Sequence, residues 1–242
     1  MKKVCQSFPS FYSSYNTCMQ LSEAQELVKQ GEARREAADF EGAIKFLTEA
    51  IKLLTKEKSY ADLVVAYKDL SLTYVHKYNY GEGSSNLDKA KQYAEGMLTV
   101  ARKHAPDSIA LAYFTLAKAV ELQGDLTAAR TAYKQALELY KGSLAERGDY
   151  RYHYGEALYI TGDKSEGKRQ METGLAEIRD GVGEVDDFLT AVWETRCLIR
   201  LAYVLNSDDP AAATKYRGEA KNHLEADLRL VILKKQFLEL FF

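Results

Sequence analysis

The stretch DSIALAYFTLAKAVELQGDLTAARTAYKQALELY, Asp107 to Tyr140, decides the fold of this chain. Small and large apolar residues recur in it at helical spacing on both sides of Gly124-Asp125, a dipeptide typical of a turn. The residues that share a face are Tyr113, Leu116, Ala117 and Val120 before the turn and Ala129, Tyr133 and Ala136 after it. The stretch therefore predicts two antiparallel helices that pack against each other as a hairpin.

Related patterns lie on both sides of this hairpin and predict three more, at residues 24–54, 60–102 and about 149–178. The second contains YNYGEGSSN, residues 78 to 86, which we expect to form an exposed loop between its helices. Beyond about residue 185 the pattern fades, although apolar helical segments continue to the end of the sequence. The chain therefore predicts an all-α fold in which one helical hairpin follows another.

Three segments follow from these patterns. Residues 1–21 contain no acidic side chain and are rich in Ser, Tyr and Phe, so we expect an N-terminal arm that is partly disordered or packed on the helices. Residues 22–180 hold about four hairpins. Residues 181–242 predict a degenerate repeat followed by a C-terminal capping helix.

Composition argues against several classes of protein. The 242 residues, of which 46% are hydrophobic, are typical of a globular protein. Thirty-three basic against 35 acidic residues give a formal net charge of -2, which offers no general attraction to nucleic acid or to an anionic membrane. No apolar run approaches the roughly 20 residues of a membrane-spanning helix. Three scattered cysteines indicate a reducing environment, so we expect a cytoplasmic protein with no nucleic-acid and no membrane partner.

The sequence gives little support for catalysis or metal binding. The histidines form no HExxH motif, and no cysteine belongs to a CxxC pair. Gly181-Val182-Gly183 follows no predicted strand, so it does not predict a phosphate site, and Cys197 lies on an apolar helix where we expect it to be buried. We therefore expect no catalytic residue, no metal and no cofactor, and predict that the protein is not an enzyme.

The hairpin pattern resembles the tetratricopeptide repeat (TPR) family, in which a large residue, Leu, a small residue and a Tyr-like residue mark one helix and Ala, an aromatic residue and Ala mark the next. The residues that match are Tyr113, Leu116, Ala117, Val120, Gly124, Ala129, Tyr133 and Ala136. Successive first-helix anchors lie roughly 38 to 46 residues apart, longer than the family's standard of about 34. This long-helix variant is similar to kinesin light chains and bacterial Rap-type regulators. The resemblance implies a right-handed α-solenoid of antiparallel hairpins.

A solenoid of this kind presents a concave groove lined by its first helices. If the repeat geometry holds, the groove is lined by residues just past the core anchors. These are Lys68, Leu72, His76, Phe114, Lys118, Glu121, Tyr152, Glu156 and Tyr159. Such a mixture of aromatic, apolar and charged side chains suits an extended or helical peptide. The alternative is an ordinary solvated face with no ligand.

Two more specific kinds of site are disfavoured. A related family group holds the C-terminal carboxylates of chaperone tails with Lys and Asn pairs, but Val28, Glu32 and Asp69 occupy the corresponding places here. The tyrosine-rich run at 150–159 could stack on bases or sugars, but only two of its tyrosines share the groove side. The net charge also opposes nucleic-acid binding.

The C-terminal segment HLEADLRLVILKKQFLELFF has apolar residues on more than one face. One stripe holds Leu224, Leu228, Val231 and Leu238, and a second holds Leu230, Leu233, Phe237 and Phe241. This is more apolar surface than a simple end cap needs. Two outcomes stay open: the helix packs back along the array, or the second stripe forms a homodimer.

The sequence therefore predicts a non-catalytic scaffold that binds a peptide or protein segment in its groove. One alternative is a peptide or small-ligand sensor whose ligand changes the curvature of the superhelix. A second alternative is a module that self-associates through its C-terminal helix. A third, an enzyme with a helical-array shell, would require a deep pocket ringed by ionisable groups.

Overall fold

The structure is a computed structural model that describes residues 21–242. The N-terminal arm predicted at residues 1–21 therefore lies outside the described residues, apart from its last position. The described part contains eleven α-helices and no β-strand. The helices are α1 (Glu23–Glu36), α2 (Phe40–Glu57), α3 (Tyr60–Asn79), α4 (Ser85–His104), α5 (Ile109–Leu122), α6 (Leu126–Leu139), α7 (Leu144–Ile160), α8 (Lys164–Asp180), α9 (Asp187–Leu205), α10 (Pro210–Ala226) and α11 (Val231–Phe241).

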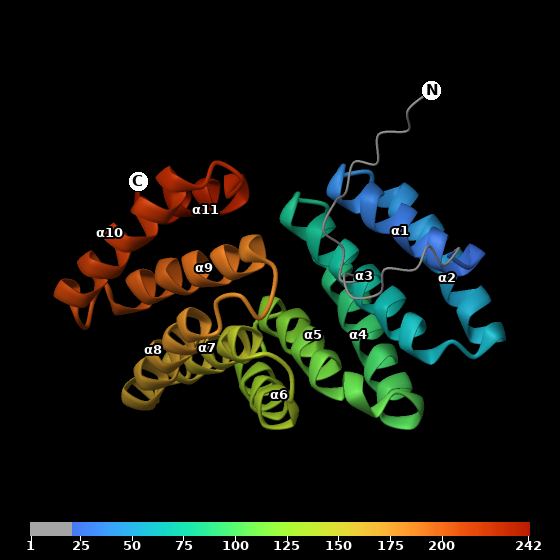
Figure 1. Ribbon diagram of the computed structural model, residues 1–242, viewed down its shortest axis with the longest axis horizontal. Coiled ribbons are helices and arrows are strands. Elements are labelled where there is room, and N and C mark those ends of the chain that lie inside the picture. The colour runs from blue at the N-terminus through green and yellow to red at the C-terminus, as the bar shows by residue number, and fades with distance from the viewer. Residues whose placement is uncertain (1–20) are drawn as a thin grey trace.

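Consecutive helices pair as antiparallel hairpins, and the hairpins stack into a curved array (Figure 1). The pairs are α1/α2, α3/α4, α5/α6, α7/α8 and α9/α10, with α11 packed mainly on α9. First helices of neighbouring hairpins contact each other, as α1 does with α3 and α7 with α9. The predicted all-α solenoid is therefore confirmed. None of the helices from residue 21 onward has the length and apolar character needed to cross a membrane.

Polar side chains define where the helices begin. Ser22 accepts a hydrogen bond from the Gln25 amide while the Gln25 side chain accepts one from the Ser22 amide, which completes a capping box at α1. Asp39 and Asp125 accept hydrogen bonds from backbone amides of α2 and α6, both at 3.0 Å. These interactions satisfy amide groups that have no partner inside the helix.

The loop predicted at residues 78–86 is shorter than expected. Helix α3 continues to Asn79 and α4 begins at Ser85, so only residues 80–84 connect them. Gly81 and Gly83 both have positive φ angles, 86° and 89°, which let the chain reverse within these few residues. The extra sequence in this repeat therefore lies mainly in the helices, which have 20 residues each against 14 in α5 and in α6.

Glycines allow α7 and α8 to pack backbone against backbone. A Cβ atom placed on Gly155 of α7 would lie 2.6 Å from the Met171 amide nitrogen. One placed on Gly167 of α8 would lie 2.5 Å from the Tyr159 amide nitrogen. Such contacts are far shorter than van der Waals distance, so no side chain fits there without separating the helices. Gly155 and Gly167 are therefore required by the close approach of these two helices.

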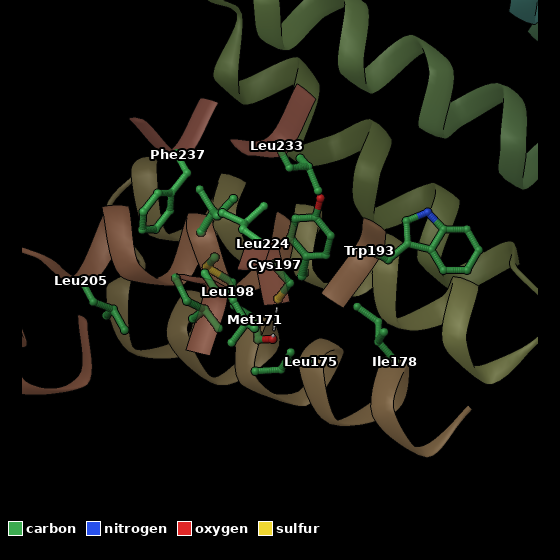
Figure 2. Packing of buried hydrophobic residues seen from close by; sticks show 14 of the residues in the cluster. Met171, Leu175, Ile178, Trp193, Cys197, Leu198, Leu205, Leu224, Leu233 and Phe237 are labelled. Atoms are coloured by element: carbon green, nitrogen blue, oxygen red, sulfur yellow. Dashed lines mark hydrogen bonds between the residues drawn. The ribbon is translucent and has the colours of Figure 1, made fainter. Parts of the chain in front are cut away.

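The last hairpin and α11 share one apolar core with α7 and α8 (Figure 2). Cys197 and Leu198 of α9 lie at its centre, next to Met171 of α8, and Trp193 lies at its edge. Cys197 is fully buried, as its position on an apolar helix predicts. Burial raises the pKa of its thiol well above the ordinary value. This thiol therefore behaves as a small apolar packing group.

Helix α11 turns its second apolar stripe towards this core. Leu230, Leu233 and Phe237 are only 3 to 5% exposed, and Phe241 is partly buried against the same cluster. These four residues were the predicted oligomer surface, but in the folded chain they pack back on α9 and are not available as a free surface. The exposed apolar residues of this end are instead Leu228, Val231, Ile232, Leu238 and Phe242.

Candidate functional site

A cleft of about 570 Å³ lies across the first helices of the array and ends at α11. Its apolar lining consists of Leu72 and Val75 of α3, Leu122 of α5, Ile199 of α9 and Leu240 of α11. Its charged and titratable lining consists of His76, Lys118, Glu121, His153, Glu156, Arg196, Arg200 and Glu239. Because these side chains come from five different helices, the cleft depends on the curvature of the whole array.

The structure brings five of the nine predicted groove residues together in this cleft. They are Leu72, His76, Lys118, Glu121 and Glu156. Lys68 lies outside the lining, with its ammonium group 3.4 Å from the Asp69 carboxylate. Asp69 is itself buried and pairs at 2.8 Å with Arg35 of α1. Lys68 therefore belongs to an ionic contact between the first two hairpins.

The three predicted aromatic residues, Phe114, Tyr152 and Tyr159, are 6%, 0% and 7% exposed. The Phe114 ring stacks on Tyr150 with ring centroids 4.1 Å apart. Tyr159 donates a hydrogen bond to Asp208, which follows α9. The expectation that these aromatic side chains face an open groove is corrected, because neighbouring hairpins cover them. Tyr152, which is fully buried, offers no surface to a partner.

The floor of the cleft combines two cations with one buried carboxylate. Lys118 of α5 and Arg196 of α9 line the cleft, and both interact electrostatically with Asp149 of α7, which is 3% exposed. Burial lowers the pKa of Lys118 to about 8, although Asp149 opposes this shift. Burial also disfavours the charge of Arg196, but Tyr152 and Asp149 outweigh it and raise the pKa of Arg196. Both groups are therefore mostly charged at neutral pH.

His153 occupies the centre of this floor as a neutral ring. It stacks on Tyr133 with ring centroids 5.4 Å apart, and its Nε2 lies 2.8 Å from the Tyr152 hydroxyl oxygen. Burial, followed by the charges of Lys118 and Arg196, lowers its pKa well below the ordinary value. The ring is therefore uncharged at neutral pH, mainly because it is buried.

Glu121 and Glu156 also belong to the charged lining. Glu156 forms an ion pair with Arg200, and its side chain is almost fully buried. Glu121 accepts a hydrogen bond of 2.6 Å from the Tyr133 hydroxyl. Burial, with Glu156 nearby, raises the pKa of Glu121. Because Glu156 pairs with Arg200 and Glu121 accepts a hydrogen bond from Tyr133, neither acid forms a direct ion pair with Lys118 or Arg196.

Arg196, Arg200 and the α11 residues were missed by sequence reasoning. A signal for the arginines exists in FLTAVWETRCLIRLAYVL, where Arg196 and Arg200 are the only basic residues and stand four positions apart on one face of an apolar helix. No such signal marks Gln236 and Leu240, because their place in the cleft depends on how α11 folds back. In the described residues, no cluster of three or more His, Cys, Asp or Glu side chains could hold a metal ion.

Comparisons with known proteins identify the fold. No family model matches the sequence, and no curated protein matches it. Among solved structures, a putative kinesin light chain with TPR-like repeats from Podosopora anserina is similar over 90% of this chain and 99% of its own, with 16% identity and a TM-score of 0.57. The Rap conjugation gene regulator of the plasmid pLS20, solved with the Phr* peptide, is similar over 91% of this chain, with 19% identity and a TM-score of 0.63.

The chain spans only 58% of the length of that Rap regulator. A third structure, YrrB, described as a TPR protein with an unusual peptide-binding site, is similar over 88% of this chain and 92% of its own, with 15% identity and a TM-score of 0.50. At these identities the likeness concerns the fold. The resemblance to long-helix TPR proteins is therefore confirmed, and the chain is a TPR-like helical-repeat solenoid.

Proposed function

We propose that this TPR-like protein is a non-catalytic scaffold that binds a short peptide, or an extended segment of a protein partner, in the cleft between α3 and α11. The observation that carries the proposal is the mixed lining of this cleft, where leucine, valine and isoleucine side chains alternate with charged groups from successive first helices. Its volume of about 570 Å³ is within the range of ligand pockets. Two of the similar structures are described with a peptide or a peptide-binding site, which agrees with this function.

Substitution of one apolar residue in the cleft tests the proposal. Leu72→Arg places a charge in the lining, whereas Leu139→Arg makes the same change at a leucine of α6 that is 42% exposed and lies outside the cleft. Peptides selected from a displayed random heptapeptide library on the wild-type chain should bind Leu72→Arg at least about tenfold more weakly, because apolar contact is lost and a charge is desolvated. They should bind Leu139→Arg as they bind wild type.

Fluorescence anisotropy measures these affinities, and circular dichroism checks that both variants fold. Equal weakening by the two substitutions would contradict a site in the cleft. A library that yields no binding peptide would contradict peptide binding itself.

Self-association through α11 is a second candidate function. The observation that favours it is the exposed apolar side of this end of the chain, where Val231 and Ile232 are 68% and 69% exposed and Leu238 is 51% exposed. Exposed apolar surface of this kind is typical of interaction sites. Light scattering after size exclusion should give a mass above one chain that falls in the variant Ile232→Lys. A single-chain mass at high concentration would contradict self-association.

A further inference from the structure

Lys118 and Arg196, both partly buried, differ from the cations Arg35 and Arg200 because they have no ion-pair partner within the described residues. Arg35 pairs with Asp69, and Arg200 pairs with Glu156. Within residues 21–242, neither Lys118 nor Arg196 has a carboxylate oxygen at ion-pair distance. The Lys118 ammonium instead lies over the Phe114 ring, 4.4 Å from its centre. Two charged groups thus stand in the cleft without a direct counter-ion.

Asp149 cannot neutralise both groups. It is one carboxylate facing two cations, and its Oδ1 atom is buried without a hydrogen-bond partner in the described residues. Burial raises the pKa of Asp149, although the charges of Lys118 and Arg196 oppose this shift. Lys118, Arg196 and an ionised Asp149 therefore leave one excess positive charge at the floor, which the acids of the wider lining offset without direct contact. The apolar side chains around it strengthen electrostatic attraction.

We propose that Lys118 of α5 and Arg196 of α9 together bind the carboxylate of an aspartate or glutamate side chain within the bound peptide. This inference rests on the proposed function and adds the chemistry of the ligand. A carboxylate in this place would receive charge-assisted hydrogen bonds from both cations. It would also provide the counter-ion that the folded chain does not supply.

The position of the cations favours an internal acidic residue over the C-terminal carboxylate of a peptide. The lining continues on one side of them to Leu72 and Val75 of α3, and on the other side to Gln236 and Leu240 of α11. A peptide chain that extends in both directions fills this lining, and its central side chain points to the floor. A terminal carboxylate at the floor would leave one half of the cleft empty.

The charge of the lining favours a single negative charge over a phosphate. Glu121, Glu156 and Glu239 also line the cleft. A doubly charged phosphate would exceed the excess positive charge of the floor and would face repulsion from these acids. A carboxylate matches the excess of about one unit.

Defined peptide pools test this inference on the full chain. The probes are labelled, N-acetylated heptapeptides that contain no lysine and end in a C-terminal amide. Leu, Val or Ala occupies each position outside the centre, and the central residue is Glu or Gln. The Glu pool should bind about tenfold more tightly than the Gln pool, as expected for a charge-assisted pair. This preference should disappear in Lys118→Gln and in Arg196→Gln.

Two variants separate charge from folding. Arg196→Lys keeps the positive charge and should retain part of the preference for the Glu pool. Lys134→Gln removes an exposed lysine of α6 outside the cleft and should change neither affinity. A preference that persists in Lys118→Gln and Arg196→Gln would overturn the assignment of the two residues.

Further pools distinguish the other ligands. Equal binding of the Glu and Gln pools would overturn the anion site while leaving peptide binding intact, whereas binding of neither pool would count against both proposals. Tighter binding of a central-Gln pool with a free C-terminal carboxylate would assign the site to a peptide end. Tighter binding of a central phosphoserine pool would replace the carboxylate by a phosphate. Either of these results would overturn the internal acidic residue.

Discussion

Replacing Gly167 in α8 by alanine is expected to lower the free energy of unfolding by about 2 to 3 kcal/mol, although alanine is the better helix former. The added methyl group would lie 2.5 Å from the Tyr159 amide nitrogen and 2.7 Å from the Gly155 carbonyl oxygen. Both obstacles are backbone atoms of α7, so no rotamer change can relieve the contact. The helices must separate, and the core that joins them to α9 loses contact as they do.

Gly218 in α10 is the matched control for this substitution. An added Cβ atom there meets nothing within 4 Å, so Gly218→Ala should raise the free energy of unfolding by up to about 1 kcal/mol through helix propensity alone. Urea unfolding followed by circular dichroism measures both variants under the same conditions. A Gly167→Ala variant as stable as the wild type, or more stable, would show that this glycine is not required by close packing.

These glycines also show why the fold could be predicted from the sequence. Small residues at helix contacts and glycine or aspartate at turns are local features, so the hairpin at 107–140 and its relatives are visible without a structure. The loop predicted at 78–86 was too long because sequence spacing alone cannot distinguish an inserted loop from longer helices. Asn86 illustrates the difference, since it is buried and lies within the first turn of α4.

The site was less predictable than the fold because it depends on contacts between hairpins. Periodicity puts Lys118 and Glu121 on the side of α5 that lines the cleft, but it cannot tell that Tyr152 is covered by the next hairpin. Arg196 was missed because the repeat pattern fades in α9, so the sequence no longer shows which positions of this helix face the groove. The second apolar stripe of α11 could equally face a core or a partner, and only packing against α9 decides which.

Replacing Lys118 by methionine is expected to raise the free energy of unfolding at pH 7 by about 1 to 2 kcal/mol, while it abolishes the preference for acidic peptides. Burial lowers the pKa of Lys118 from its ordinary 10.5 to about 8, so the charged form is less stable in the folded chain than in the unfolded chain. This shift already includes the favourable interaction with Asp149, and the loss of the ammonium contact with the Phe114 ring keeps the gain below the full value of the shift.

The pH dependence of this effect follows from the direction of the shift. Between pH 8 and 10.5 the unfolded chain binds more protons at Lys118 than the folded chain, so the stability of the wild type rises with pH through this window. Lys118→Met lacks this rise, and its advantage over the wild type should therefore shrink from pH 8 upward. Lys134→Met, at an exposed lysine of α6, should follow the wild type at every pH.

Stability and binding together distinguish a ligand-binding lysine from a structural one. The groups that face Lys118 are Asp149 of α7, Arg196 of α9, Glu121 of its own helix and the Phe114 ring beneath it. If Lys118 served mainly to neutralise Asp149, its loss would lower stability at pH 7 and the proposed binding role would be contradicted. If it is retained for a ligand carboxylate, the methionine variant is more stable and binds acidic peptides less well. The charge of Lys118 destabilises the folded chain while the cleft is empty, and its presence is explained if a bound anion becomes its partner.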